Sequence, residues 1–200
     1  MRKNNIQALV ESAVLIALSV VLSFFTIYKM PMGGTVTPFA MAPLVILSLR
    51  WGHVWGIGAG LTYGMIHMLL GLENFSYVTG ITALLGVALL DYLIAFGSYG
   101  LASIFAKPFN NSNNKFIGYG AAAFACGTMQ FLCSFLSGIL IWGGWAPEGT
   151  PVWIYSLTYN GSFALPNAIL TVIGTVAAMA VLDRVFPVRQ KISTEEYWDV

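Results

Sequence analysis

Long apolar stretches occupy most of this 200-residue chain and restrict what it can fold into. A helix needs about 20 apolar residues to cross the roughly 30 Å hydrocarbon core of a bilayer. Six stretches are candidates, at residues 7–28, 36–50, 53–72, 79–106, 115–142 and 154–186. Charged residues make up only 8% of the chain, against about 25% in soluble domains. The sequence therefore predicts an all-α membrane protein, with six transmembrane helices in a single domain over residues 1–200.

The placement of charge predicts how these helices are oriented. In a six-span arrangement, Lys29 lies on one side of the membrane together with Glu73 and Glu148. Cytoplasmic loops are enriched in lysine and arginine, so we expect the other side, and with it both termini, to be cytoplasmic. That side carries the remaining cations, Arg2, Lys3, Arg50, Lys107, Lys115, Arg184, Arg189 and Lys191.

Ionisable side chains inside a span are costly and usually mark function. Asp91 lies in the middle of the fourth stretch, followed by Tyr92, and the sequence favours contact with a ligand or ion over a purely structural hydrogen bond. Glu11 lies about one turn into the first stretch, where we expect it to reach water or the neighbouring Arg2 and Lys3. His67, in the third stretch, is interpreted as a packing residue rather than a proton relay.

The segment Trp142–Pro166 is unusually rich in aromatic residues for a connection between helices. Trp145 and Trp153 are typical of the aromatic belts at membrane interfaces. Trp142, Tyr155 and Asn160 fit a belt less well, because Asn160 already lies within the last stretch and its amide needs partners there. These three side chains are candidates for the wall of a pocket that binds a flat, cationic ligand.

Small residues at four-residue spacing allow two helix backbones to approach closely. Gly56, Gly60 and Gly64 form such a face in the third stretch, and there the pattern favours packing within the protein. In the first stretch, Ala13 and Ala17 fit packing within the protein and docking of another membrane protein equally well. Residues 29–38, with two adjacent glycines between prolines, are either a mobile lid or an ordinary turn.

Several kinds of chemistry lack their sequence signals. The chain has no phosphate-binding P-loop, nucleophile elbow or HExxH motif. Cys126 and Cys133 are best explained as small buried packing residues. We therefore expect a protein that is not an enzyme, with no metal, no cofactor and no nucleic-acid partner.

Two motifs carry a resemblance to a known family. APEGTPVWIYSLTYN, residues 146–160, and LLDYLIAFGSYGLA, residues 89–102, resemble the thiamine-specific substrate-binding subunit, or S component, of energy-coupling factor transporters. PMGGTV (31–36) and LSLRWG (47–52) resemble the first loop and the end of the second helix of that family. The resemblance implies a six-helix, multi-pass protein of a prokaryotic plasma membrane that binds thiamine with high affinity.

The same resemblance implies partners and site residues. Transport would require a transmembrane coupling subunit, contacted through Ala13 and Ala17, and two ATPase subunits that hydrolyse ATP. Two positions depart from the family pattern, because Ser134 and Gln130 replace a histidine and a basic residue. The ligand-binding positions that the motifs match, together with Ser134, are Asp91, Tyr92, Gly138, Trp142, Tyr155 and Asn160.

These residues lead to one hypothesis and two alternatives. Asp91 and Asn160 would hydrogen-bond the aminopyrimidine of thiamine, Trp142 and Tyr155 would stack on its rings, and the 29–38 loop would close the pocket. The first alternative is an S component for a thiamine precursor such as hydroxymethylpyrimidine, or for another vitamin. The second is a proton-coupled small-molecule carrier that uses Asp91 and His67.

Overall fold

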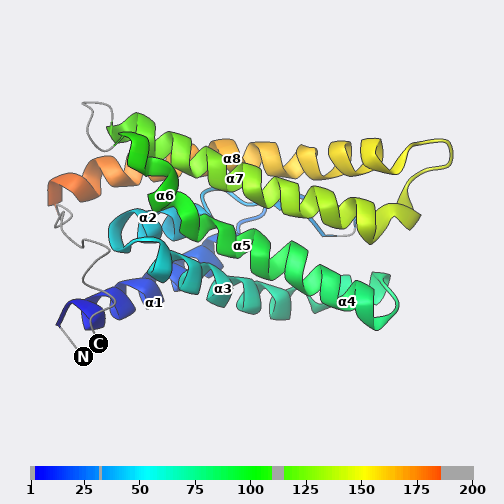
Figure 1. The fold of residues 1–200 in the computed structure, drawn as a ribbon, viewed down its shortest axis with the longest axis horizontal. Coiled ribbons are helices and arrows are strands. Elements are labelled where there is room, and N and C mark those ends of the chain that lie inside the picture. The colour runs from blue at the N-terminus through cyan, green and yellow to red at the C-terminus, as the bar shows by residue number, and fades with distance from the viewer. Residues whose placement is uncertain (1–2, 32, 110–114, 186–200) are drawn as a thin grey trace.

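The computed structural model describes residues 3–31, 33–109 and 115–185, which form an elongated bundle of helices (Figure 1). The main helices in chain order are α1 (Lys3–Ser23), α2 (Ala42–Trp51), α3 (His53–Leu70), α4 (Ile81–Val87), α5 (Ala95–Gly97), α6 (Ala102–Ala106), α7 (Lys115–Leu140) and α8 (Val152–Val185). Two short 3-10 helices, η1 (Leu72–Tyr77) and η5 (Trp142–Trp145), follow α3 and α7.

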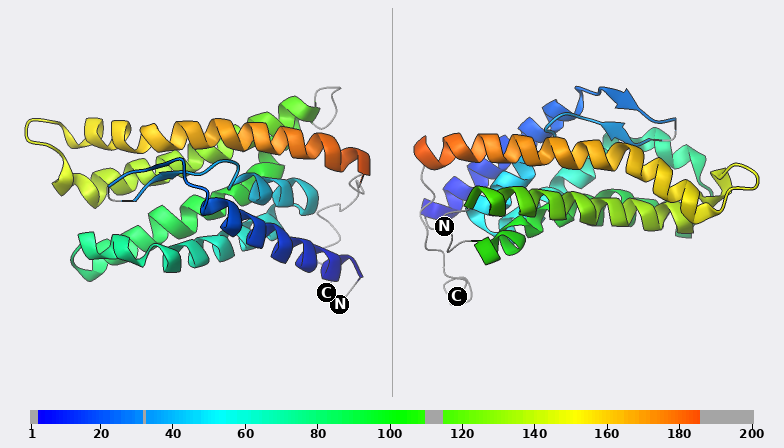
Figure 2. Two further views of the ribbon diagram at one scale, coloured as in Figure 1. Left: turned by 180° about the vertical axis from the view of Figure 1, so that it is seen from behind. Right: turned by 90° about the horizontal axis from the view of Figure 1, so that it is seen from above.

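A short antiparallel hairpin connects α1 to α2. Its strands are β1 (Tyr28–Lys29) and β2 (Thr35–Val36), with Lys29 opposite Thr35. Figure 2 shows this hairpin alongside α8. The hairpin thus brings the beginning of the chain next to its last helix.

The fourth predicted stretch is one long helical segment with changes of pitch. After α4 come the π-helical η2 (Ala88–Ile94), α5, the 3-10 turn η3 (Ser98–Leu101), α6 and the 3-10 turn η4 (Lys107–Phe109). Asp91 lies within η2. π-helical turns are rare and occur frequently at functional sites.

Four helical segments within the described residues are long and apolar enough to cross a membrane: Asn5–Ser23, Ile81–Phe109, Lys115–Leu140 and Val152–Val185. The structure corrects two predicted boundaries. The first helix ends at Ser23 instead of near residue 28, and the second begins at Ala42 instead of residue 36. Pro38 disfavours helix before it, and Phe39 has a φ of 61°, which is incompatible with a continuing right-handed helix.

The helix ends separate into two groups. Figure 1 shows the start of α1, the α2–α3 junction, the start of α7 and the end of α8 toward one end of the bundle. The η1 turn and the α7–α8 connection lie toward the other end. Arg50, Lys115 and Arg184 therefore lie toward the same end, in agreement with the charge pattern of the sequence.

The glycine face of α3 packs internally against the fourth segment, as predicted. A Cβ atom added to Gly56 would lie 2.9 Å from the Cα of Gly100, and one added to Gly64 would lie 2.8 Å from the carbonyl oxygen of Tyr92. Real Cβ atoms do not approach other atoms so closely, so glycine is what allows these two backbones to touch. This contact places α3 side chains next to those of η2 and α5.

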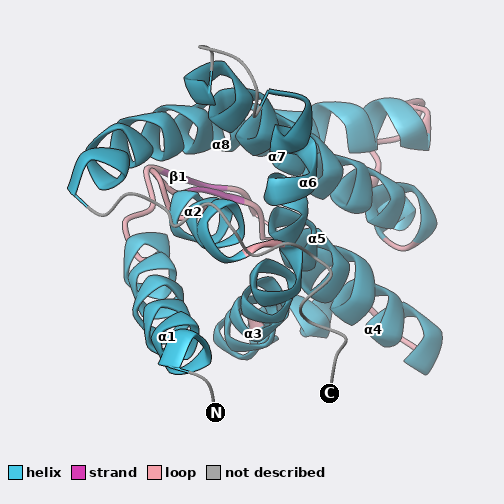
Figure 3. Ribbon diagram, turned by 60° about the vertical axis from the view of Figure 1, so that its left-hand side comes forward, coloured by secondary structure: helices cyan, strands magenta, loops and turns pink. Residues whose placement is uncertain are grey.

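The helices α7 and α8 lie side by side along most of their length (Figures 1 and 3). Small residues again permit the approach, since a Cβ on Gly127 would lie 2.8 Å from that of Ala168. Cys126 and Cys133 are buried in α7 as free thiols. Their prediction as packing residues is confirmed.

The structure gives Glu11 a partner that the sequence did not predict. Its carboxylate forms a partly buried ion pair with Arg50 of α2. Arg2 lies outside the described residues. The pairing partner is distant in sequence because folding returns α2 to the beginning of α1, which the local charge pattern does not reveal.

Candidate functional site

A cavity of about 330 Å³ lies among the hairpin, α3, η1, η2, α7 and α8. Sites for small molecules typically have volumes of about 300–1,000 Å³. All seven predicted ligand-binding positions line it: Asp91, Tyr92, Ser134, Gly138, Trp142, Tyr155 and Asn160. Residues from three separate stretches of the chain therefore meet at one place.

Asp91 has one carboxylate oxygen fixed by the protein. Its Oδ2 accepts hydrogen bonds from Ser137 Oγ at 2.7 Å and from Trp142 Nε1 at 3.2 Å. Within the described part of the chain, Oδ1 accepts no hydrogen bond and no basic residue pairs with Asp91, so this carboxylate can serve a ligand.

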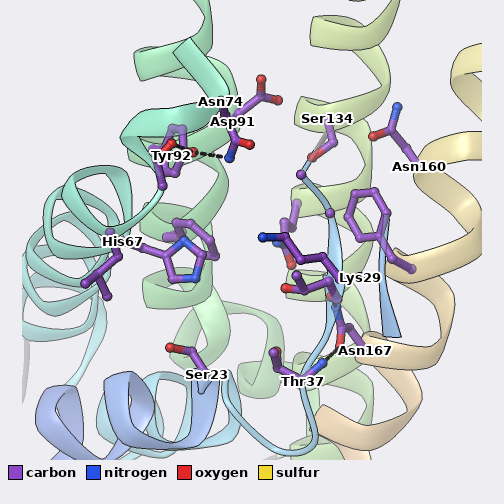
Figure 4. A pocket seen from close by; sticks show the side chains of 18 of the residues that line it. Ser23, Lys29, Thr37, His67, Asn74, Asp91, Tyr92, Ser134, Asn160 and Asn167 are labelled. Atoms are coloured by element: carbon purple, nitrogen blue, oxygen red, sulfur yellow. Dashed lines mark hydrogen bonds between the residues drawn. The ribbon is translucent and has the colours of Figure 1, made fainter. Parts of the chain in front are cut away.

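Asn160 lies across the cavity on α8 and is 7% exposed. Its Nδ2 donates to the carbonyl oxygen of Ser156 at 3.0 Å and lies 3.1 Å from Ser156 Oγ. Because these contacts orient the amide, its Oδ1 is left to face the cavity on the side of Ser134 (Figure 4). Gly138 makes room for this pair, since a Cβ there would lie 2.9 Å from Asn160 Nδ2.

The two positions that depart from the family pattern form a neutral part of the wall. Ser134 is nearly buried on α7, and Figure 4 shows it between Asp91 and Asn160. One turn earlier, Gln130 Oε1 accepts a hydrogen bond from the hydroxyl of the buried Tyr99 at 2.6 Å. This bond holds the Gln130 amide in one orientation at the cavity wall.

Aromatic rings cover the sides of the cavity. The rings of Tyr155 and Tyr159 on α8 have centroids 5.6 Å apart, and Trp142 lines the cavity from η5. Trp145 and Trp153 are not among the residues lining the cavity and are 49% and 56% exposed. The division of this segment into a belt and a pocket wall is therefore consistent with the structure.

Tyr92 is turned toward η1. Its hydroxyl accepts a hydrogen bond from Asn74 Nδ2 at 3.1 Å, drawn in Figure 4, and its ring stacks on Phe75 at 5.8 Å. Tyr92 thus closes the cavity on this side, and direct contact with a ligand stays a prediction.

The sequence did not reveal Asn167, which joins the hairpin to α8. Its Oδ1 accepts from the backbone N–H of Thr37 at 3.0 Å, and its Nδ2 donates to the carbonyl oxygen of Thr35 at 2.7 Å. The sequence feature that could have identified Asn167 is its position as an asparagine directly after Pro166 in an apolar helix. Tyr159 adds a hydrogen bond to the carbonyl oxygen of Gly33 at 3.3 Å.

On its opposite side the hairpin contacts η1. Lys29 Nζ lies 2.9 Å from Glu73 Oε1, with side chains 61% and 67% exposed. Both residues line the cavity. The hairpin therefore bridges the cavity from α8 to η1, held by buried hydrogen bonds on one side and by an exposed ion pair on the other.

Two further predicted features lie in different places. His67 lines the cavity from α3. Ala13 and Ala17 are exposed on α1 and are not among the cavity residues. A role for the two alanines must therefore be separate from ligand contact.

Comparison with known proteins gives a consistent result. The model of the thiamine transporter protein family matches residues 9–187. The thiamine transporter ThiT of Bacillus subtilis is 31% identical over 173 residues, covering 82% of this chain and 86% of that protein. ThiT of Lacticaseibacillus paracasei is 28% identical over 185 residues, covering 89% of each. A solved structure of ThiT from Listeria monocytogenes has a similar fold, with a TM-score of 0.69 at 21% identity, covering 92% of this chain and 97% of that one.

Proposed function

Because this chain belongs to the thiamine transporter protein family, we propose that it is the thiamine-binding S component of an ATP-driven energy-coupling factor transporter. The relatives named above are transporters and not enzymes. The observation that carries the proposal is the unpaired Asp91 carboxylate in an aromatic cavity.

The charge balance of the cavity favours a cationic ligand. Among the described residues that line it, Glu73 is paired with Lys29, which leaves Asp91 without a basic partner. A buried carboxylate is stabilised by a positive charge brought by its ligand. The neutral side chains of Gln130 and Ser134 add no repulsion, and thiamine carries a permanently cationic thiazolium.

The remaining contacts suit the aminopyrimidine. Asp91 Oδ1 and Asn160 Oδ1 are acceptors on facing walls, and the exocyclic amine of thiamine is a donor. The rings of Trp142 and Tyr155 are placed to contact the flat rings of the ligand. A desolvated cation–π contact contributes about 2 kcal/mol, so these rings would add substantially to affinity.

The hairpin would act as the lid of this site. Gly33 and Gly34, both with positive φ, line the cavity, and the hairpin touches both walls through the contacts described above. The buried bonds to Asn167 would keep the hairpin on α8, whereas the exposed Lys29–Glu73 pair would separate to admit ligand.

Transport would need partner subunits. We expect Ala13 and Ala17, exposed on α1, to contact a transmembrane coupling subunit, and two ATPases to supply the energy. We also expect six membrane-spanning segments with both termini in the cytoplasm of a prokaryote, in line with the separation of charges between the two ends of the bundle.

Calorimetry on the purified protein tests this function. Thiamine should bind tightly in a one-to-one complex and quench the fluorescence of Trp142. Mass spectrometry of small molecules released on denaturation should detect thiamine. Absence of thiamine binding, with binding of hydroxymethylpyrimidine or another vitamin, would contradict the assignment of the ligand.

A proton-coupled carrier remains a second candidate because His67 and Asp91 line the same cavity. The two functions predict different uptake. An energy-coupling factor transporter needs its ATPase partners and continues to work with a protonophore while ATP is present. Uptake by this chain alone that a protonophore abolishes would support the carrier instead.

A further inference from the structure

Two polar groups on α3 line the cavity, but the contacts proposed for the aminopyrimidine do not use them. Tyr63 is fully buried, and its hydroxyl has no hydrogen-bond partner within the described residues. One turn later, Nδ1 of His67 is also buried and unpartnered. Both side chains line the cavity, and their ring centroids are 5.4 Å apart.

The surroundings of this pair are aromatic. The Phe96 ring packs edge-on against Tyr63, with centroids 4.9 Å apart, and lies tilted against His67 at 5.2 Å. The Tyr92 ring lies 6.2 Å from His67. These rings provide no hydrogen-bond partner for a hydroxyl or an imidazole nitrogen. The pair is therefore a polar recess in an otherwise apolar wall.

The hydroxyl of Ser23 lies near that of Tyr63, but within the described residues the Tyr63 hydroxyl has no hydrogen-bond partner. Buried polar groups in native proteins are nearly always paired. Two adjacent exceptions at a cavity wall indicate that a ligand atom completes them.

The recess and Asp91 line the same cavity from different helical segments, α3 and η2. Figure 4 shows His67 and Ser23 across the cavity from Asn160. A ligand that reaches both places must carry a second polar group, apart from the one that contacts Asp91.

We propose that Tyr63 and His67 form a second subsite that binds a neutral hydroxyl group of the ligand. This inference rests on the proposed function, in which the hydroxyl is that of the hydroxyethyl arm of thiamine. A hydroxyl can accept from Tyr63 O–H and donate to neutral His67 Nδ1 at the same time. The two protein atoms are almost inaccessible to solvent, so their side chains have to shift slightly to admit the hydroxyl.

The test compares thiamine with an analogue that has an ethyl group in place of the hydroxyethyl arm. Calorimetry with the wild-type protein should show thiamine binding about fivefold to tenfold more tightly than the analogue. Tyr63→Phe removes only the hydroxyl. It should weaken thiamine binding by the same factor and leave the analogue unchanged, and His67→Phe should act likewise.

Tyr119→Phe is the matched control, because that hydroxyl contacts Asp183 and is not among the cavity residues. It should leave both affinities unchanged. Without ligand, Tyr63→Phe should melt no earlier than wild type, since the lost hydroxyl has no partner in the protein.

Two results would overturn the subsite while leaving the thiamine function intact. One is equal affinity of the wild type for thiamine and the analogue; the other is an equal loss of affinity for the two ligands in Tyr63→Phe. A wild-type protein that does not bind thiamine would overturn both.

Discussion

Replacement of Asp91 by asparagine isolates the charge that the cavity offers to its ligand. The carboxylate uses Oδ2 for Ser137 and Trp142 and leaves Oδ1 for the cavity. An asparagine of nearly the same shape keeps one oxygen for the two donors. It then presents an NH₂ group where Oδ1 was, so the variant loses both the negative charge and the acceptor.

The expected loss follows from that change. A hydrogen bond to a charged group contributes about 1.5–3 kcal/mol, and about 1.4 kcal/mol corresponds to a tenfold change in Kd. The Kd for thiamine should therefore rise about 10-fold to 150-fold. The loss should appear mainly as faster dissociation, because the fold and the entrance to the cavity are unchanged.

Titration calorimetry in detergent, at one salt concentration, measures this change. Asp183→Asn is the matched control: it removes the same charge at the opposite end of the bundle, where Asp183 contacts Lys115 at 2.8 Å, and should not alter Kd. Thermal melting verifies that both variants are folded. A folded Asp91→Asn protein that binds thiamine within twofold of wild type would remove Asp91 from the binding site and refute the reasoning.

Three other substitutions test the packing, the lid and the docking face. Gly56→Ala should lower the stability by about 1–3 kcal/mol, because its Cβ would lie 2.9 Å from a backbone α carbon of the fourth segment. Thermal melting should show this loss. The control Gly58→Ala should be at least as stable as wild type, since nothing lies within 4 Å of that position and alanine favours a helix more than glycine does. Asn167→Ala removes both hydrogen bonds to the hairpin and should speed thiamine dissociation about tenfold in stopped-flow fluorescence. Glu73→Gln should change the dissociation rate less than threefold, because an exposed ion pair contributes little. Equal dissociation rates for the two variants would contradict the proposed lid. Ala17→Leu should prevent co-purification with the coupling subunit without changing the Kd for thiamine, and an intact complex would exclude this face of α1 as the contact.

The sequence predicted the features that depend on local composition. Apolar stretches located the long helices, and four-residue spacing identified the packing face of Gly56 and Gly64. Asp91 could be placed in the interior because a carboxylate in the middle of an apolar helix cannot easily reach water at either membrane surface. The motif containing Asn160 placed its side chain at the same site through family resemblance.

The features that sequence reasoning missed depend on which distant segments meet. Glu11 pairs with Arg50, 39 residues away, and Asn167 bonds to Thr35, 132 residues away. The shortening of the second helix depends on the conformation of a single residue, Phe39. The orphan hydroxyl of Tyr63 becomes visible only when its surroundings are known.

The π-helical turn around Asp91 makes the site sensitive to chain length. Successive residues of an α-helix are separated by about 100°, and the wider π turn reduces this angle. Neighbours in sequence, Asp91 and Tyr92, can therefore both line the cavity. Deletion of one residue here, such as Leu90, would restore α-helical geometry and rotate the carboxylate away from Ser137, while the glycine contacts farther along would stay in place. The geometry of the site therefore depends on the number of residues in this turn as well as on their identity.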